Sequence, residues 1–181
     1  MNFEELDDET RKWMIMEFED EWAQKNHYQS TQLNERGIVE FPKIMKNVLQ
    51  KGTIDSLTKE LSNPSFWKST RTATRKGNSY TISINPSTEA KKLAHSEFTT
   101  FYTRGFSRRL KEEGVTECEV YRADVAHQPK CECTSLEGTK QPVDKIYNGH
   151  RAKYFPKYNS TAFSIPSAPF CHHTIRRIKN K

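Results

Sequence analysis

Residues 85–114 read NPSTEAKKLAHSEFTTFYTRGFSRRLKEEG, and this stretch predicts a long helix. Asn85 is a favourable capping residue, and Pro86 suits the first helical position, where no intrahelical N–H is needed. Apolar side chains then recur at helical spacing and define one face, which is formed by Leu93, Ala94, Phe98, Phe101, Tyr102, Phe106 and Leu110. Gly114 supplies the stop. We therefore expect a helix over residues 85–113 that buries this face against a small sheet.

Shorter helical patterns precede the long helix. Apolar residues at helical spacing predict an amphipathic helix over residues 3–25. Pro42 predicts the first turn of a second helix, which ends at Gly52. A short third helix is expected to group Ile54, Leu57 and Leu61.

Two strands and a loop-rich end are expected around these helices. Alternation of apolar and polar residues predicts strands at residues 80–84 and 118–122. Beyond Asp124 prolines break up the chain, at Pro129, Pro142, Pro156, Pro166 and Pro169. The fold class is therefore α+β, with an N-terminal helical segment followed by a long helix packed on a small sheet and a loop-rich C-terminal part.

A basic stretch separates two expected regions of the chain. Residues 68–79, KSTRTATRKGNS, contain no large apolar side chain and read as a linker, a loop, or an arm lying on an acidic surface. We expect residues 1–78 to form a helical N-terminal segment with this basic linker. Residues 79–181 are expected to form an α+β domain.

The charge of the chain is unevenly distributed. The formal net charge is +6, yet residues 1–21 hold nine acidic and two basic side chains, a balance of −7, which leaves +13 for the remaining 160 residues. A basic body fits a nucleic-acid neighbour, an acidic protein partner or a solvated surface. No helix-turn-helix signature favours sequence-specific reading. The candidates for non-specific contact with nucleic acid are Arg71, Arg75, Lys76, Arg108 and Arg109.

The N-terminal residues MNFEELDDET are acidic, whereas a signal peptide begins with a basic region and an apolar run. No apolar run approaches the ~20 residues of a membrane-spanning helix. We therefore expect synthesis in a cytoplasm, no membrane partner, and cysteines that stay reduced.

The cysteines and histidines of the last third suggest a metal site. Cys131, Cys133, Cys171 and one of His172 or His173 form a three-sulfur, one-nitrogen set that suits tetrahedral zinc. In an extended segment neighbouring side chains point to opposite faces, so Cys171 and His173 share a face and His173 is the better fourth ligand. Buried thiols or a hydrogen-bonded histidine seam are the alternatives.

The order of several short motifs resembles a known family. Gly114-Val115 with Val120 is followed by Cys131 and Cys133, then by Leu136-Glu137-Gly138. Pro166 and Pro169 lead into the terminal box, Cys171-His172-His173. This order, over roughly residues 85–178, resembles the Mu-type minor head proteins of tailed phages, also called head-morphogenesis or minor capsid proteins.

The resemblance implies a non-enzymatic virion structural or assembly protein, held inside the phage head near the portal. Its implied partners are the portal, other capsid proteins and packaged DNA bound without sequence preference, and a homo-oligomer is compatible with it. Its location would be the virion, and the host cytoplasm during assembly.

The alternative is a small metal-dependent nuclease that uses His127, His150, His172 and His173, or another DNA-binding zinc protein. The sequence has no H-N-H spacing, P-loop or H-E-x-x-H motif to favour such an enzyme. A host-directed toxin or inhibitor is a third reading, without a motif in its favour.

Overall fold

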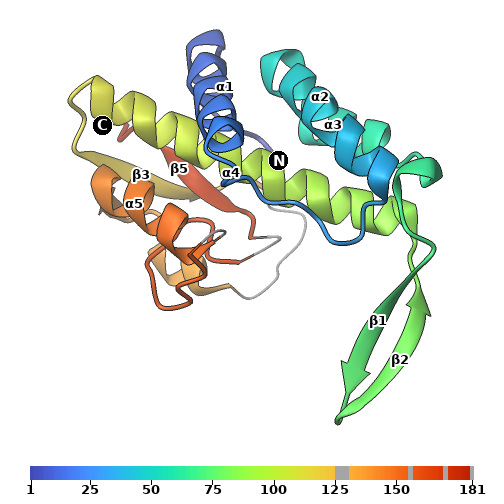
Figure 1. Cartoon of the computed structure of the whole chain (residues 1–181). Helices are drawn as coiled ribbons and strands as arrows, with labels where there is room; N and C mark the ends of the chain where they lie inside the picture. The colour runs from blue at the N-terminus through green and yellow to red at the C-terminus, as the bar shows by residue number, and fades with distance from the viewer. Residues whose placement is uncertain (125–130, 155–156, 169–170, 180–181) are drawn as a thin grey trace. The chain divides into compact units, whose positions relative to one another are not determined.

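The structure of the chain is a computed structural model that describes residues 1–124, 131–154, 157–168 and 171–179 (Figure 1). The fold is mixed α+β, as predicted, and its elements follow in the order α1 (Asp8–Ala23), α2 (Glu35–Lys51), α3 (Ile54–Leu61), the 3-10 turn η1 (Pro64–Phe66), β1 (Thr70–Arg75), β2 (Asn78–Ser83), α4 (Pro86–Glu112), β3 (Glu117–Arg122), the 3-10 turn η2 (Glu132–Leu136), β4 (Lys140–Pro142), α5 (Val143–Lys153) and β5 (His173–Arg176). Within the described ranges, no helix is both long and apolar enough to cross a membrane. Outside them lie four residues named above, His127, Pro129, Pro156 and Pro169.

The chain divides into two compact units. One combines Met1–Tyr28 with Ser96–Lys181, and the other is Gln29–His95. This grouping differs from the expected division after residue 78, because the N-terminal helix pairs with residues that follow it by about ninety positions or more, as in the contact of Glu17 with Arg108. The first helix and the sheet of the first unit therefore come from opposite ends of the chain.

The sheet of the first unit has three antiparallel strands in the order β4-β3-β5. Val120 of β3 faces Ile175 of β5, and Arg122 faces His173. The predicted apolar face of α4 is buried in this unit at Phe98, Phe101, Tyr102 and Phe106. The Tyr102 hydroxyl donates to the carbonyl oxygen of Ile175 at 3.4 Å, which ties the helix to the sheet. The predicted packing of the long helix on a small sheet is confirmed.

α1 packs on α4 beside the face that meets the sheet. Arg108 contacts Glu17 and Asp20 at 3.1 and 2.7 Å, and Arg109 contacts Asp7 at 2.6 Å. Acidic residues of the N-terminal segment therefore neutralise these two arginines. Arg108 and Arg109, which we expected to contact nucleic acid, are engaged in these internal ion pairs.

Gly105 allows the backbones of α1 and α4 to approach closely. A Cβ atom at this position would lie 2.5 Å from the backbone nitrogen of Met14, which has no room to retreat. In an ordinary helix interior, Gly→Ala stabilises by roughly 0.5–1 kcal/mol. We expect Gly105→Ala instead to lower the free energy of unfolding by about 1–3 kcal/mol, because the added methyl overpacks the contact. Urea unfolding measures whether the free energy of unfolding falls or rises. A rise in Gly105→Ala would contradict the close approach of the two helices.

The second unit contains α2, α3 and the β1–β2 hairpin. Asn34 caps α2, since its side chain accepts from the backbone N–H of Gly37 at 2.9 Å. The predicted helix start at Pro42 was wrong, because Asn34 supplies a better cap and Pro42 lies inside the helix. Gly52 ends α2, and α3 spans Ile54–Leu61, both as predicted.

The basic stretch of residues 68–79 was not a linker. It forms β1 and the turn into β2, with Arg71 opposite Ile82 and Arg75 opposite Asn78. The two turn residues, Lys76 and Gly77, have φ angles of 50° and 82°, as a two-residue hairpin turn requires. Threonines alternate along β1, and their branched side chains favour the extended backbone.

Candidate metal centre

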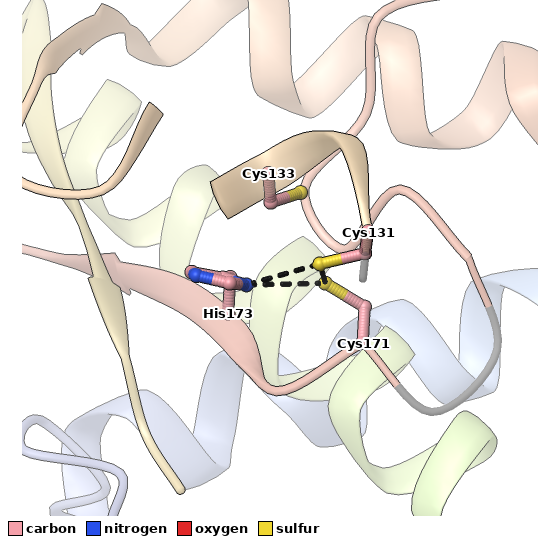
Figure 2. Close-up of side chains that lie close together, drawn as sticks. All are labelled: Cys131, Cys133, Cys171 and His173. Atoms are coloured by element: carbon pink, nitrogen blue, oxygen red, sulfur yellow. Dashed lines mark hydrogen bonds between the residues drawn. The ribbon is translucent and has the colours of Figure 1, made fainter. Parts of the chain in front are cut away.

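Four side chains of the first unit gather at one point. Cys131, Cys133, Cys171 and His173 each offer one donor atom, and these atoms lie within 4.8 Å of one another (Figure 2). Cys131 is half-buried and the other three side chains are buried. The structure thus brings together the four predicted ligands in a cluster that could bind a metal ion. Cys118, the remaining cysteine, is buried in β3 outside this cluster, where its thiol donates to the Gln141 carbonyl at 3.7 Å.

Local backbone geometry presents the first two sulfurs. Cys131 caps η2, and its carbonyl accepts from the backbone N–H of Thr134 at 3.1 Å, which starts the tight turn. Cys133 is the second residue of η2, and its side chain points toward the other ligands (Figure 2). Glu132, between them, is exposed and approaches Lys153 at 3.4 Å. The Cys-x-Cys spacing therefore directs two thiols inward and the intervening carboxylate outward.

The second pair of ligands comes from the chain entering β5. His173 is the first residue of β5, and the His172 carbonyl accepts from the backbone N–H of Ala123 at 2.8 Å. His172 Nδ1 lies 3.3 Å from Asp124 Oδ2, away from the sulfurs. The alternation expected of an extended segment thus places Cys171 and His173 on the cluster side.

The distances in the cluster are those of neighbouring ligands and not of a covalent bond. Cys131 Sγ lies 3.5 Å from Cys171 Sγ, and His173 Nδ1 lies 3.3 Å from the first sulfur and 3.7 Å from the second. A disulfide requires about 2.05 Å between sulfurs, and all four cysteines are free. These three donors, with the Cys133 sulfur within 4.8 Å of each of them, form a set that could hold one ion.

The electrostatics of the thiols favour a cation. The hydrogen bond to Cys133, together with burial, raises the pKa of Cys171, whereas the pKa of Cys133 is lowered by its hydrogen bond with Cys171. Burial and the contact with Cys171 raise the pKa of Cys131. Deprotonation of Cys133 is thus favoured over deprotonation of Cys131 and Cys171, because several negative charges would share a buried volume. A bound divalent ion removes this conflict by stabilising all the thiolates.

The Glu137 carboxylate contacts the nitrogen of His173 that faces away from the sulfurs. His173 Nε2 lies 3.3 Å from Glu137 Oε2, while Nδ1 faces the sulfurs. Arg122 Nη2 holds the same carboxylate at 2.9 Å. Such a carboxylate fixes the ring orientation and places the proton on the outer nitrogen, which leaves the inner nitrogen free to bind a metal.

Glu137 and Arg122 were missed from the sequence. Glu137 belongs to the Leu136-Glu137-Gly138 motif, where Gly138 has a φ of 77°. Nothing in the local pattern connects Glu137 with a histidine 36 positions later. Arg122, which holds Glu137, lies opposite His173 in the sheet. This position is known only once β3 is paired with β5.

A buried segment closes the cluster on the side of Cys133. Its thiol donates to the Ser164 carbonyl at 3.8 Å, and the Ser164 hydroxyl donates to the Pro166 carbonyl at 2.6 Å. The Tyr154 hydroxyl, at the end of α5, donates to the same carbonyl at 3.1 Å. Residues 164–167 are buried and pack beside the ligands.

The other predicted site residues lie elsewhere. Arg71, Arg75 and Lys76 are exposed on the β1–β2 hairpin. Among the histidines of the nuclease alternative, His150 is fully buried and accepts from Arg104 Nε at 3.1 Å. Burial and the charge of Arg104 lower the pKa of His150. His150 and His172 thus have separate surroundings, and neither belongs to the cluster.

Comparisons of the chain with protein-family models, curated proteins and solved structures find no match. The function is therefore inferred from the geometry of the cluster and from the order of the motifs.

Proposed function

We propose that the chain is a zinc-stabilised structural protein of a tailed-phage head, and that it acts in assembly near the portal and not as an enzyme. The observation that carries this proposal is the closed cluster of Cys131, Cys133, Cys171 and His173.

The donor set and its spacing fit zinc. Thiolates and imidazole are the ligands that zinc prefers among the metals available to proteins. Zn–S bonds of about 2.3 Å and Zn–N bonds of about 2.0 Å at tetrahedral angles place two sulfurs about 3.8 Å apart, and a sulfur about 3.5 Å from a nitrogen. The observed separations of 3.3, 3.5 and 3.7 Å are within a few tenths of these values.

Four protein ligands favour a structural role for the ion. Catalytic zinc sites keep one coordination position for water or substrate, whereas structural sites are filled by protein side chains. Here the set is complete and mostly buried, and the segment of residues 164–167 packs against it. The zinc would join the η2 turn to β5, which lie some 40 residues apart along the chain.

The role in a phage head is supported by the way the motifs of the resemblance meet. The Cys-x-Cys turn, the Leu136-Glu137-Gly138 turn and the Cys171-His172-His173 box are separate in sequence, yet they supply the ligands and the orienting carboxylate of one centre. The three motifs then have one physical role in common, which is to build this centre. The proposed partners are the portal and other capsid proteins, with the protein held inside the head in few copies and assembled from the host cytoplasm; self-association is compatible with this role.

Quantitative mass spectrometry of purified particles tests the role. Heads made by cells that carry the gene are expected to contain the chain, in a few copies per portal ring, after washing in high salt. Recovery of the chain only in the soluble cell fraction would overturn the proposed function. This result would leave the metal centre itself unaffected, since zinc is measured on the isolated protein.

Glu137→Gln is expected to weaken zinc binding by about 10–100-fold, because the neutral amide orients His173 less strongly than the carboxylate does. Competition with a chromogenic chelator measures this affinity on the purified protein. Glu132→Gln is the matched control, since Glu132 lies between two ligands but its side chain is 83% exposed and directed away. Equal losses in both variants would show that the contact of Glu137 with His173 has no special role.

A further inference from the structure

The β1–β2 ribbon, defined as residues 70–83, has two exposed faces. Among the described residues its strands pair only with each other, and along them only Ala73 and Ile82 are half-buried. The ribbon is anchored at its base, where Trp67 and Ile84 are buried and Ile84 N–H donates to the Ser69 carbonyl at 2.9 Å. A single two-stranded hairpin is marginally stable alone, so a partner that covers it has much to contribute.

The register gives the two faces different chemistry. One face consists entirely of hydroxyl side chains, which are Thr70, Thr72, Thr74, Ser79, Thr81 and Ser83. On the other face Tyr80 lies opposite Ala73, and Arg71 and Arg75 lie diagonally on either side of the ring. Lys76 occupies the turn at the tip. The polar side chains of the ribbon are cations, hydroxyls or the Asn78 amide, and none is acidic.

The charge of the surrounding unit points to an anionic partner. Residues 29–95 contain eleven basic and five acidic side chains, a balance of +6, whereas residues 1–28 and 96–181 together contain eighteen of each and sum to zero. The entire net charge of the protein therefore belongs to the unit with the ribbon. No acidic residue occurs between Glu60 and Glu89. In the described part of the chain, no ion pair neutralises Arg71, Arg75 or Lys76.

We propose that the β1–β2 ribbon binds duplex DNA in the major groove, with Arg71, Arg75 and Lys76 on the phosphates and the hydroxyl face supplying further donors. The major groove admits a two-stranded β-ribbon, and its two phosphate walls suit a ribbon with hydroxyl groups on one face and arginines on the other. Serine, threonine, arginine and lysine side chains are common phosphate contacts. Phosphate contacts carry no sequence information, so we expect the binding to be indifferent to sequence.

Other anionic partners fit the ribbon less well. An interface with an acidic protein would need a larger apolar centre than the one formed by Ala73, Tyr80 and the half-buried Ile82. Single-stranded nucleic acid is held by successive aromatic side chains on which bases stack, and the ribbon has Tyr80 alone. The inference rests on the proposed function only for the identity of the DNA as packaged genome; the binding itself is a property of the isolated protein.

The test uses the full-length protein with a fluorescent duplex of about 20 base pairs, two unrelated sequences, and a single strand of the same length. Fluorescence anisotropy is measured between about 50 and 200 mM salt. We expect the triple variant Arg71→Ala, Arg75→Ala and Lys76→Ala to reduce the salt slope by about 2.7, because each neutralised phosphate contributes about 0.9 to that slope. At ~0.1 M salt the affinity should fall on the order of 10²-fold on both duplexes.

The matched control removes the same charge from the same unit. Lys46, Lys51 and Lys59 are exposed on α2 and α3. Their triple replacement by alanine is expected to change the affinity for DNA less than about threefold, because only the screened long-range attraction between these charges and the duplex is lost. Both triple variants should keep the thermal unfolding temperature, since all six side chains are exposed.

Four results would overturn the inference: no duplex binding at ~50 mM salt, equal losses in the two triple variants, preference between the duplex sequences, or binding to the single strand as tight as to the duplex. None of them bears on the particle composition, so failure of the ribbon and failure of the proposed function are separate outcomes.

Discussion

Purified protein is expected to contain close to one equivalent of zinc, and Cys133→Ser or His173→Ala is expected to abolish it. Each variant removes one of four ligands from a closed set, and the remaining donors lose the tetrahedral geometry. Elemental analysis by plasma mass spectrometry measures the bound metal. His172→Ala is the matched control: it removes the neighbouring imidazole, which lies beside Asp124, and should keep the zinc.

Removal of zinc should also destabilise the protein. A cross-link over a loop of about 40 residues restricts the unfolded chain by roughly 4 kcal/mol in the chain-entropy account, and thus shifts the unfolding temperature by on the order of 10 °C. A strong chelator should therefore lower the Tm of the native protein and of His172→Ala, and leave that of Cys133→Ser unchanged. Zinc retained by Cys133→Ser, or an identical Tm with and without the chelator, would contradict the structural role of the ion.

Phe101→Ala is expected to reduce the free energy of unfolding by ~3–5 kcal/mol. The Phe101 ring is 1% exposed, and its edge meets Phe18 of α1 with ring centroids 5.4 Å apart. The variant loses the burial of the ring and leaves a cavity between the two helices. Denaturant unfolding followed by circular dichroism gives the difference.

Met16→Ala provides the comparison for Phe101→Ala. Met16 lies on α1, as Phe18 does, but Met16 is 41% exposed, so its truncation should cost less than about 1 kcal/mol. Similar losses in the two variants would mean that the contact between α1 and α4 does not contribute specifically to stability.

The long helix and the ligand set were predictable because their signals are local or chemical. Asn85 and Pro86 mark the start of α4, and its buried aromatic residues recur at the helical period. The metal ligands follow from residue type, since thiols and imidazole are the ligands that zinc prefers. The alternation of side chains along an extended chain was enough to choose His173 over His172.

The features that were missed depend on contacts between distant segments or on weak turn signals. The Lys76-Gly77 turn lacks the usual Asn-Gly signature, and no apolar residue in β1 is large enough to indicate a strand. Within α5, Asn148-Gly149 reads as a turn, yet Gly149 is helical, and a Cβ there would collide with the Phe163 carbonyl oxygen. The role of Glu137 required the pairing of β3 with β5.

The division of the chain into units has a consequence for its synthesis. Residues 29–95 form a continuous unit, inserted between the two parts of the other unit, Met1–Tyr28 and Ser96–Lys181. Domains fold as they leave the ribosome, and contacts between remote residues form late. The inserted unit is therefore expected to fold first, while α1 remains without its partners until α4 emerges. The zinc site closes last, when His173 has been translated, so a ribosome that stalls before this residue leaves the inserted unit folded and the rest of the nascent chain available to proteases.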